Sequence, residues 1–210
     1  MILMALLTVV VAFIFLAVAE YVARTQRKFH SETMRKTVHI VAGCVVATWP
    51  FYFPWWMIGL LGLAALVVIA ISLQYKTFHS IYGVNRRSIG EILFAVTIGL
   101  LAFLAGNRWI FAAAMLHLGL ADGLAAIIGV KYGKRNRYKL LGYYKSWVGT
   151  ATFFAVSAII MIAYAAVTHS HDFTLLASVP LLTTLVENFA VAGTDNLLVP
   201  LMVAGMLKFF

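Results

Sequence analysis

Acidic residues are rare in this sequence, and four of the seven lie where they could take part in chemistry. Asp122 lies inside a long apolar stretch. The other three lie at the ends of apolar stretches: Glu91, Glu187 and Asp195. An ionisable side chain at membrane depth is costly, so such residues are usually paired or functional. We therefore expect these carboxylates to gather in one site at one side of a membrane.

Asp122 is the strongest candidate because small residues surround it. Its helical neighbours would be Gly119, Ala125, Ala126 and Gly129, and small side chains allow another helix or a ligand to approach closely. No cation lies three or four positions away in the sequence to neutralise the carboxylate. We expect a functional role for it. The alternative is a protonated carboxyl group that forms a hydrogen bond with another helix.

The other carboxylates each leave two interpretations open. Glu91 follows Arg87 by four residues, so it could form an interfacial ion pair on one helix face or bind a metal or substrate. Glu187 and the pair Asp195-Asn196 flank a short break between two apolar stretches. Such a break at membrane depth usually lines a cavity. The alternative is an interfacial turn.

The basic residues are concentrated in three short segments. The chain has 16 Lys and Arg residues and a formal net charge of +9, and most of these cations lie in residues 24–37, 74–88 and 131–147. Cytoplasmic loops of membrane proteins are enriched in Lys and Arg. We therefore expect these segments to face the cytoplasm, with the N-terminus outside. A nucleic-acid partner is not expected, because the basic segments are short and separated by apolar stretches.

Carboxylates beside cations are what metal–nucleotide chemistry requires. Mg²⁺ is usually held by one or two carboxylates together with phosphate oxygens, and Lys and Arg neutralise the charge of a transferring phosphoryl group. The sequence contains neither G-x-x-x-x-G-K-[ST] nor G-x-G-x-x-G. If a nucleotide binds, it does so without the P-loop or Rossmann fingerprint of soluble nucleotide-binding proteins.

The elements that must position these residues are membrane helices. Hydrophobic residues make up 63% of the chain and charged residues 11%, against about 25% charged residues in ordinary soluble domains. We predict a single all-α domain over residues 1–210, a polytopic transmembrane helical bundle of about seven spans. The expected spans are residues 2–21, 38–49, 57–73, 89–105, 109–130, 148–167 and 173–189. A last apolar stretch, 197–210, is short for a span perpendicular to the membrane.

Five short segments carry a recognisable pattern of polar residues and glycines. One runs from Leu120 to Gly129 and continues to Tyr132-Gly133-Lys134, and another runs from Lys145 to Thr150. The remaining three are Arg35-Lys36 with His39 and Gly43; Ser88 to Ile92; and Val186-Glu187 with Thr194-Asp195-Asn196 and Val199-Pro200. In this order they resemble the signatures of the CTP-dependent polyprenol kinases, a family that includes dolichol kinase, phytol kinase and a CTP-using diacylglycerol kinase. Dolichol kinases carry Glu where Val148 stands, so the phytol kinase form is closer.

The resemblance implies a kinase that phosphorylates a membrane lipid alcohol at the cytoplasmic face, such as phytol, farnesol or a polyprenol, with CTP as donor and Mg²⁺ as cofactor. It implies that Asp122 and Glu91 are the catalytic residues and that Asp122 binds the metal, with help from Glu91 or Asp195. One carboxylate, with Asp122 as the first candidate, would accept or orient the hydroxyl proton. The residues expected to bind the nucleotide are Arg35, Lys36, His39, Arg87, Lys134, Lys145, Ser146, Gly149 and Thr150. Glu187 and Asn196 are further expected site residues.

Two other functions fit the same pattern. The motifs also resemble those of CTP:phosphatidate cytidylyltransferases, whose needs for metal and nucleotide are similar. A small membrane transporter is the alternative from a different class, because intramembrane acids also serve ion pathways. The expected grouping of the acids at one membrane face, rather than along a path through the bilayer, favours an enzyme.

Overall fold

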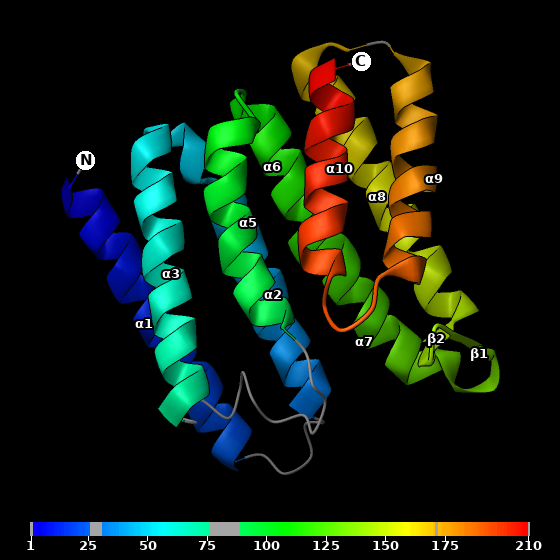
Figure 1. Cartoon of the computed structure of the whole chain (residues 1–210), viewed down its shortest axis with the longest axis horizontal. Coiled ribbons are helices and arrows are strands. Elements are labelled where there is room, and N and C mark those ends of the chain that lie inside the picture. Colours follow the sequence, from blue (N-terminus) through cyan, green and yellow to red (C-terminus); the bar gives the residue numbers. More distant parts are fainter. Residues whose placement is uncertain (1, 26–30, 76–88, 171, 210) are drawn as a thin grey trace.

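The chain forms a bundle of roughly parallel helices with a small β-hairpin at one end (Figure 1). The computed structural model describes residues 2–25, 31–75, 89–170 and 172–209. The helices of the described residues are α1 (Ile2–Thr25), α2 (Ser31–Ala47), α3 (Trp55–Tyr75), α5 (Gly90–Leu104), α6 (Arg108–Leu116), α7 (Asp122–Tyr132), α8 (Trp147–Thr168), α9 (Phe173–Phe189) and α10 (Asp195–Phe209). The predicted all-α class is confirmed.

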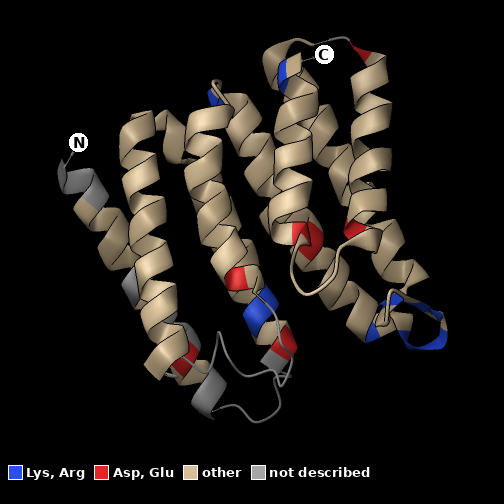
Figure 2. Ribbon diagram, in the orientation of Figure 1, with Lys and Arg blue, Asp and Glu red and all other residues tan. Residues whose placement is uncertain are grey.

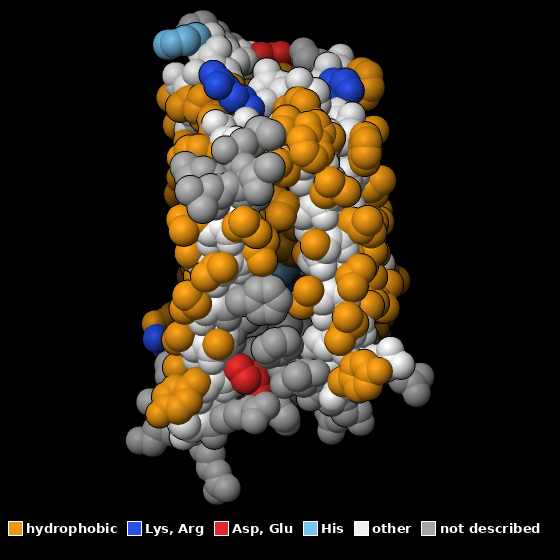
Figure 3. Space-filling view, turned by 90° about the vertical axis from the view of Figure 1, so that its left-hand side faces the viewer, with side chains coloured by type: hydrophobic (Ala, Val, Ile, Leu, Met, Phe, Trp, Pro, Cys, Tyr) orange, Lys and Arg blue, Asp and Glu red, His pale blue; other side chains and the backbone are white. Residues whose placement is uncertain are grey.

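Three helical stretches are long and apolar enough to cross a membrane: Trp55–Tyr75, Arg108–Arg135 and Trp147–Thr168. Gly90–Leu104 and Phe173–Phe189 are shorter apolar helices. Large apolar side chains such as Phe103 and Ile159 lie on the outside of the bundle, and Figure 3 shows one face covered mainly by hydrophobic side chains along its height. Lipid is the solvent that such a surface requires. The chain is therefore an integral membrane protein, and the count of seven spans stays a prediction.

α2 begins well before the apolar stretch that marks it in the sequence. It starts at Ser31 rather than near residue 38, so that Arg35 and Lys36 belong to the helix. Hydropathy misses these turns because they are polar, yet Lys36 is buried against α7. Glu32 in the first turn also suits the positive end of the helix dipole.

The fifth predicted span is one long helix with a π-helical segment in its middle. Residues His117–Ala121 connect α6 to α7 in this wider form, and insertions of this kind often occur at functional sites. The buried His117 accounts for part of the geometry, since its Nδ1 lies 2.8 Å from the Ala113 carbonyl oxygen and its Nε2 2.8 Å from Ser157 Oγ on α8. The contact with Ser157 joins this long helix to α8.

α2 crosses the π-helical segment at two glycines. A Cβ atom built on Gly43 would lie 2.5 Å from the Gly119 Cα atom, and one built on Gly119 would lie 2.7 Å from the Gly43 Cα atom. These distances leave no room for a side chain on either residue, so the backbones are in direct contact. This close crossing places Lys36 and His39, on the preceding turns of α2, beside Asp122.

The segment expected to be a polar loop, residues 131–147, contains a β-hairpin. β1 (Arg137–Leu140) pairs antiparallel with β2 (Tyr143–Ser146), with Arg137 opposite Ser146. The turn residues Leu141 and Gly142 both have positive φ, as two-residue hairpin turns of type I′ require. The sequence gives a weak signal for this turn, because Leu rarely adopts positive φ.

Candidate active site

Most of the Lys, Arg, Asp and Glu positions coloured in Figure 2 lie at the end of the bundle that carries the hairpin. A cavity of about 440 Å³ opens there between α2, α5, α7, α9, α10 and the hairpin. Its lining includes five acidic residues, Glu32, Glu91, Asp122, Glu187 and Asp195, and four basic residues, Arg35, Lys36, Arg137 and Lys145. The predicted gathering of acids and cations from distant segments is therefore found in the structure.

Asp122 is neutralised by a cation from another helix. The Lys36 ammonium group donates to Asp122 Oδ2 at 2.5 Å, and both side chains are buried. His39 Nε2 lies 3.4 Å from the same oxygen and 2.9 Å from the Leu118 carbonyl oxygen, within the π-helical segment. The sequence could not reveal the ion pair between Lys36 and Asp122, because 86 residues separate the two in the chain. The carboxylate is therefore held between Lys36 and His39 of α2.

Glu187, near the end of α9, forms a similar pair with the hairpin. Lys145 on β2 donates to Glu187 Oε1 at 2.7 Å and also to the Glu187 main-chain carbonyl oxygen. Both side chains are largely buried, at 16% and 13% exposure. The ion pair therefore fixes the hairpin against the end of α9.

Asp195 and Asn196 begin α10, where the polar groups of two helices meet. The Asn196 side-chain amide donates to the Gly90 carbonyl oxygen at 2.7 Å, and Thr97 donates to the Asn196 carbonyl oxygen at 2.8 Å. These bonds tie α10 to α5. Asn196 lines the cavity, and its Oδ1 atom is buried with no hydrogen-bond partner among the described residues. A buried acceptor without a hydrogen-bond partner is costly, so the Asn196 oxygen is suited to bind a cation or a hydrogen-bond donor of a ligand.

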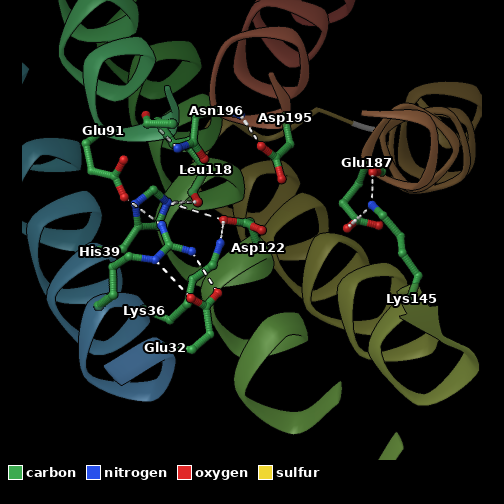
Figure 4. A network of polar contacts seen from close by, with 12 residues as sticks. Glu32, Lys36, His39, Glu91, Leu118, Asp122, Lys145, Glu187, Asp195 and Asn196 are labelled. Carbon is green, nitrogen blue, oxygen red and sulfur yellow. Dashed lines mark hydrogen bonds and ion pairs between the residues drawn. The ribbon is translucent and has the colours of Figure 1, made fainter. Parts of the chain in front are cut away.

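Three carboxylates point toward one another across the cavity. One oxygen from each of Asp122, Glu187 and Asp195 lies within 4.8 Å of the others, and Figure 4 shows them brought from α7, α9 and α10. Like charges this close repel strongly in a buried site. Hard divalent cations take oxygen ligands of this kind. Asn196 lines the same cavity with an oxygen that has no hydrogen-bond partner among the described residues, and together these residues fit a Mg²⁺ ion.

Glu91 lies in the same cavity but outside this group of three. It accepts from Arg35 Nη1 at 2.8 Å, and Arg35 also pairs with Glu32 at 2.8 Å. The structure therefore groups Glu187, rather than Glu91, with the other two carboxylates. Arg87, the predicted partner of Glu91, lies outside the described residues.

Several residues of the segment from Lys145 to Thr150 line the cavity together. Ser146 is the N-cap of α8, and its hydroxyl group accepts from the Gly149 backbone at 3.1 Å. Gly149 and Thr150 follow in the first turn, and Thr150 donates to Asn188 Oδ1 at 3.0 Å. A helix N-terminus favours anionic ligands. Lys134 is exposed and is not among the lining residues.

Three hairpin residues that line the cavity were not singled out from the sequence: Arg137, Tyr143 and Tyr144. They lie on the hairpin, in the same basic segment as Lys145. Alternation along β2 places Tyr143 on the face of Lys145, but this signal is usable only once the segment is known to form strands.

Ser146→Ala is expected to destabilise the protein by about 1 kcal/mol, because the first turn of α8 would lose its cap. The measurement is the thermal unfolding midpoint of the purified protein in detergent. Ser170→Ala, a change beyond the other end of α8, is the matched control and should leave the midpoint unchanged. Equal midpoints for the two variants would show that the cap contributes nothing.

The fold and the cavity together define an integral membrane protein with a buried, charged site where its helices end. No family model matches the sequence, and no solved structure matches the chain. The chain is 35% identical over 178 residues to phytol kinase from Synechocystis sp., an alignment that covers 81% of this chain and 76% of that protein. The chain belongs to the polyprenol/phytol kinase family.

Proposed function

We propose that this protein transfers the γ-phosphoryl group of CTP to the hydroxyl group of an isoprenoid alcohol in the membrane, such as phytol, farnesol or a polyprenol. The relative that is a phytol kinase supports a kinase of this class. The observation that carries the proposal is the group of three carboxylates within 4.8 Å, flanked by Lys36 and Lys145. Such an arrangement suits a triphosphate bound with a divalent cation.

The position of the cavity suits a substrate that is part lipid. The cavity opens where α2, α5 and α10 begin and α9 ends, beside helices whose outer surfaces are apolar. An isoprenoid tail could therefore remain in lipid while its hydroxyl group reaches the carboxylates. The concentration of Lys and Arg in residues 24–37, 74–88 and 131–147 supports a cytoplasmic face for this end and an N-terminus outside.

Asp122, Glu187 and Asp195 would hold Mg²⁺, with Asn196 Oδ1 as a further oxygen and Glu91 as a more distant acid. When bound, the ion would neutralise charge on the phosphates during transfer. Lys145 and the α8 N-terminus at Ser146, Gly149 and Thr150 would bind the triphosphate. Arg35, Lys36 and Arg137 supply further positive charge around the cavity.

The proposed reaction is a direct transfer of the phosphoryl group from CTP to the alcohol. The hydroxyl oxygen forms a bond to the γ-phosphorus atom as the bond from γ-phosphorus to the β–γ bridging oxygen breaks, and CDP leaves. The hydroxyl proton passes to one of the cavity carboxylates, for which Asp122 is our choice because His39 on α2 helps to fix its position. Most of the rate enhancement would come from positioning and charge neutralisation.

Label transfer from CTP tests the proposal. The purified protein in lipid vesicles is supplied with CTP labelled at the γ or the α phosphate, together with phytol, farnesol, a polyprenol or phosphatidate. Label from the γ position in a lipid alcohol product is the expected result. Label from the α position in phosphatidate would instead identify a cytidylyltransferase. Transfer of neither label, with an ion flux that depends on Asp122, would identify a transporter.

A further inference from the structure

Two of the three grouped carboxylates already have a lysine as partner. Lys36 lies 2.5 Å from Asp122 Oδ2, and Lys145 lies 2.7 Å from Glu187 Oε1 (Figure 4). Among the described cations, none forms an ion pair with the third carboxylate, Asp195. The side chains of the Lys36 pair are 8% and 7% exposed, so each charge depends on its partner, because an unpaired buried charge is strongly destabilising.

These lysines neutralise two of the carboxylates that a divalent cation would need. A metal ion bound by Asp122 and Glu187 would compete for carboxylate groups whose charge the two ammonium groups already compensate. If it arrived alone, Lys36 and Lys145 would be left in the cavity without their counter-charges. If a triphosphate arrived alone, it would take up the lysines and leave the three carboxylates facing one another within 4.8 Å.

We infer that Lys36 and Lys145 exchange partners when a divalent cation and a nucleoside triphosphate bind together. The carboxylates then pair with the cation and the lysines pair with phosphate oxygens, so that every buried charge stays compensated. The inference rests on the proposed function in that the site takes a triphosphate. The Asn196 oxygen has no hydrogen-bond partner within the part of the chain that the structure describes, and it independently supports a cavity built for a ligand that can bind to an acceptor.

Partner exchange predicts strong coupling between the two ligands. Each ligand alone breaks ion pairs without replacing them, whereas the two together replace every pair they break. The coupling is reciprocal, because each ligand must change the affinity for the other by the same factor. Wild-type protein should therefore bind Mn²⁺, a paramagnetic substitute for Mg²⁺, at least about tenfold more tightly with CTP than without it.

The experiment titrates the full chain in detergent with Mn²⁺, with and without CTP and without lipid alcohol, and measures free Mn²⁺ by electron paramagnetic resonance. Because Mn²⁺ also binds CTP in solution, the Mn²⁺ bound by the same concentration of CTP without protein is measured and subtracted. Lys36→Met is expected to bind Mn²⁺ alone more tightly than wild type, because Asp122 no longer has a competing cation. The same variant should lose most of the enhancement by CTP. Lys36→Arg keeps the charge and should retain the enhancement.

Two further variants keep the inference testable if Lys36→Met does not fold. Lys145→Met alters the more exposed pair and is expected to show the same loss of coupling. Lys131→Met is the matched control, since Lys131 is an exposed cation on α7 that lies over the Tyr132 ring and is not among the lining residues. Its coupling should equal that of wild type.

Equal Mn²⁺ affinity with and without CTP in the wild-type protein would overturn the inference, as would weaker binding of Mn²⁺ alone by both lysine-to-methionine variants. These outcomes are separable from failure of the proposed function. If γ label reaches the lipid alcohol while Mn²⁺ and CTP bind independently, the kinase assignment stands and the exchange is wrong. If coupling is found but only α label is transferred, the exchange stands and the kinase assignment is wrong.

Discussion

Asp122→Asn is expected to lower the rate of phosphoryl transfer on the order of 10³-fold. The change removes one of the three grouped carboxylates and also the counter-charge of Lys36. Both losses act on the transferring phosphate, because the cation would be held less tightly and the lysine would lose its fixed position. The measurement is a single-turnover assay of γ-label transfer with the protein in excess over CTP.

Asp172→Asn is the matched control for this change. Asp172 is exposed at the opposite end of the bundle, where it caps α9 by accepting from the Thr174 and Leu175 backbone groups. Asn caps helices about as well as Asp, so this variant should transfer phosphate at the wild-type rate. Equal rates for Asp122→Asn and Asp172→Asn would contradict the assignment of the site.

Asp195→Asn separates loss of activity from loss of folding. Asp195 contributes to the repulsion among the three carboxylates without an ion pair of its own among the described residues. Without ligand, its neutral variant should therefore unfold at a temperature at least as high as wild type. Its Mn²⁺ affinity and transfer rate should fall. Functional sites commonly show this opposition between stability and activity.

The second large effect is expected from Gly119→Leu, which should destabilise the protein by about 3 kcal/mol. A Cβ atom at Gly119 meets the Gly43 Cα atom at 2.7 Å and the His39 carbonyl oxygen at 3.4 Å. These are backbone atoms, so a side chain must push α2 away from the π-helical segment. Because α2 carries Lys36 and His39, activity should fall together with the unfolding midpoint.

Gly99→Leu provides the control for this prediction. Gly99 lies in the middle of α5, and a Cβ atom built there meets no atom within 4 Å. The same substitution should therefore leave the midpoint and the transfer rate close to those of wild type. If both variants behave alike, the close crossing of α2 and the π-helical segment is not what holds these elements together.

The apolar stretches of the sequence predict most helices to within a few residues, because burial in lipid imposes long continuous runs of apolar side chains. The exception is α2, whose first turns are polar and are stabilised by partners on other helices. The π-helical segment and the hairpin were also not predicted. Both depend on local backbone geometry, which leaves little trace in hydropathy.

The site could be predicted as a set of residues but not as a set of pairs. The motifs predict Asp122, Glu187, Asp195 and Lys145 as residues of one site, and all four line the cavity. Which carboxylate stands beside which lysine depends on how α2, α9 and the hairpin pack, and no spacing in the sequence records this. Glu91 illustrates the limit, since it was grouped with Asp122 but forms its ion pair with Arg35.

The ion pair between Lys36 and Asp122 also bears on how the protein is made. Synthesis proceeds from the N-terminus, so the lysine leaves the ribosome 86 residues before the aspartate that neutralises it. A buried ammonium group without a counter-charge is strongly destabilising, so we expect α2 to reach its final packing against α7 only after residue 122 has been made.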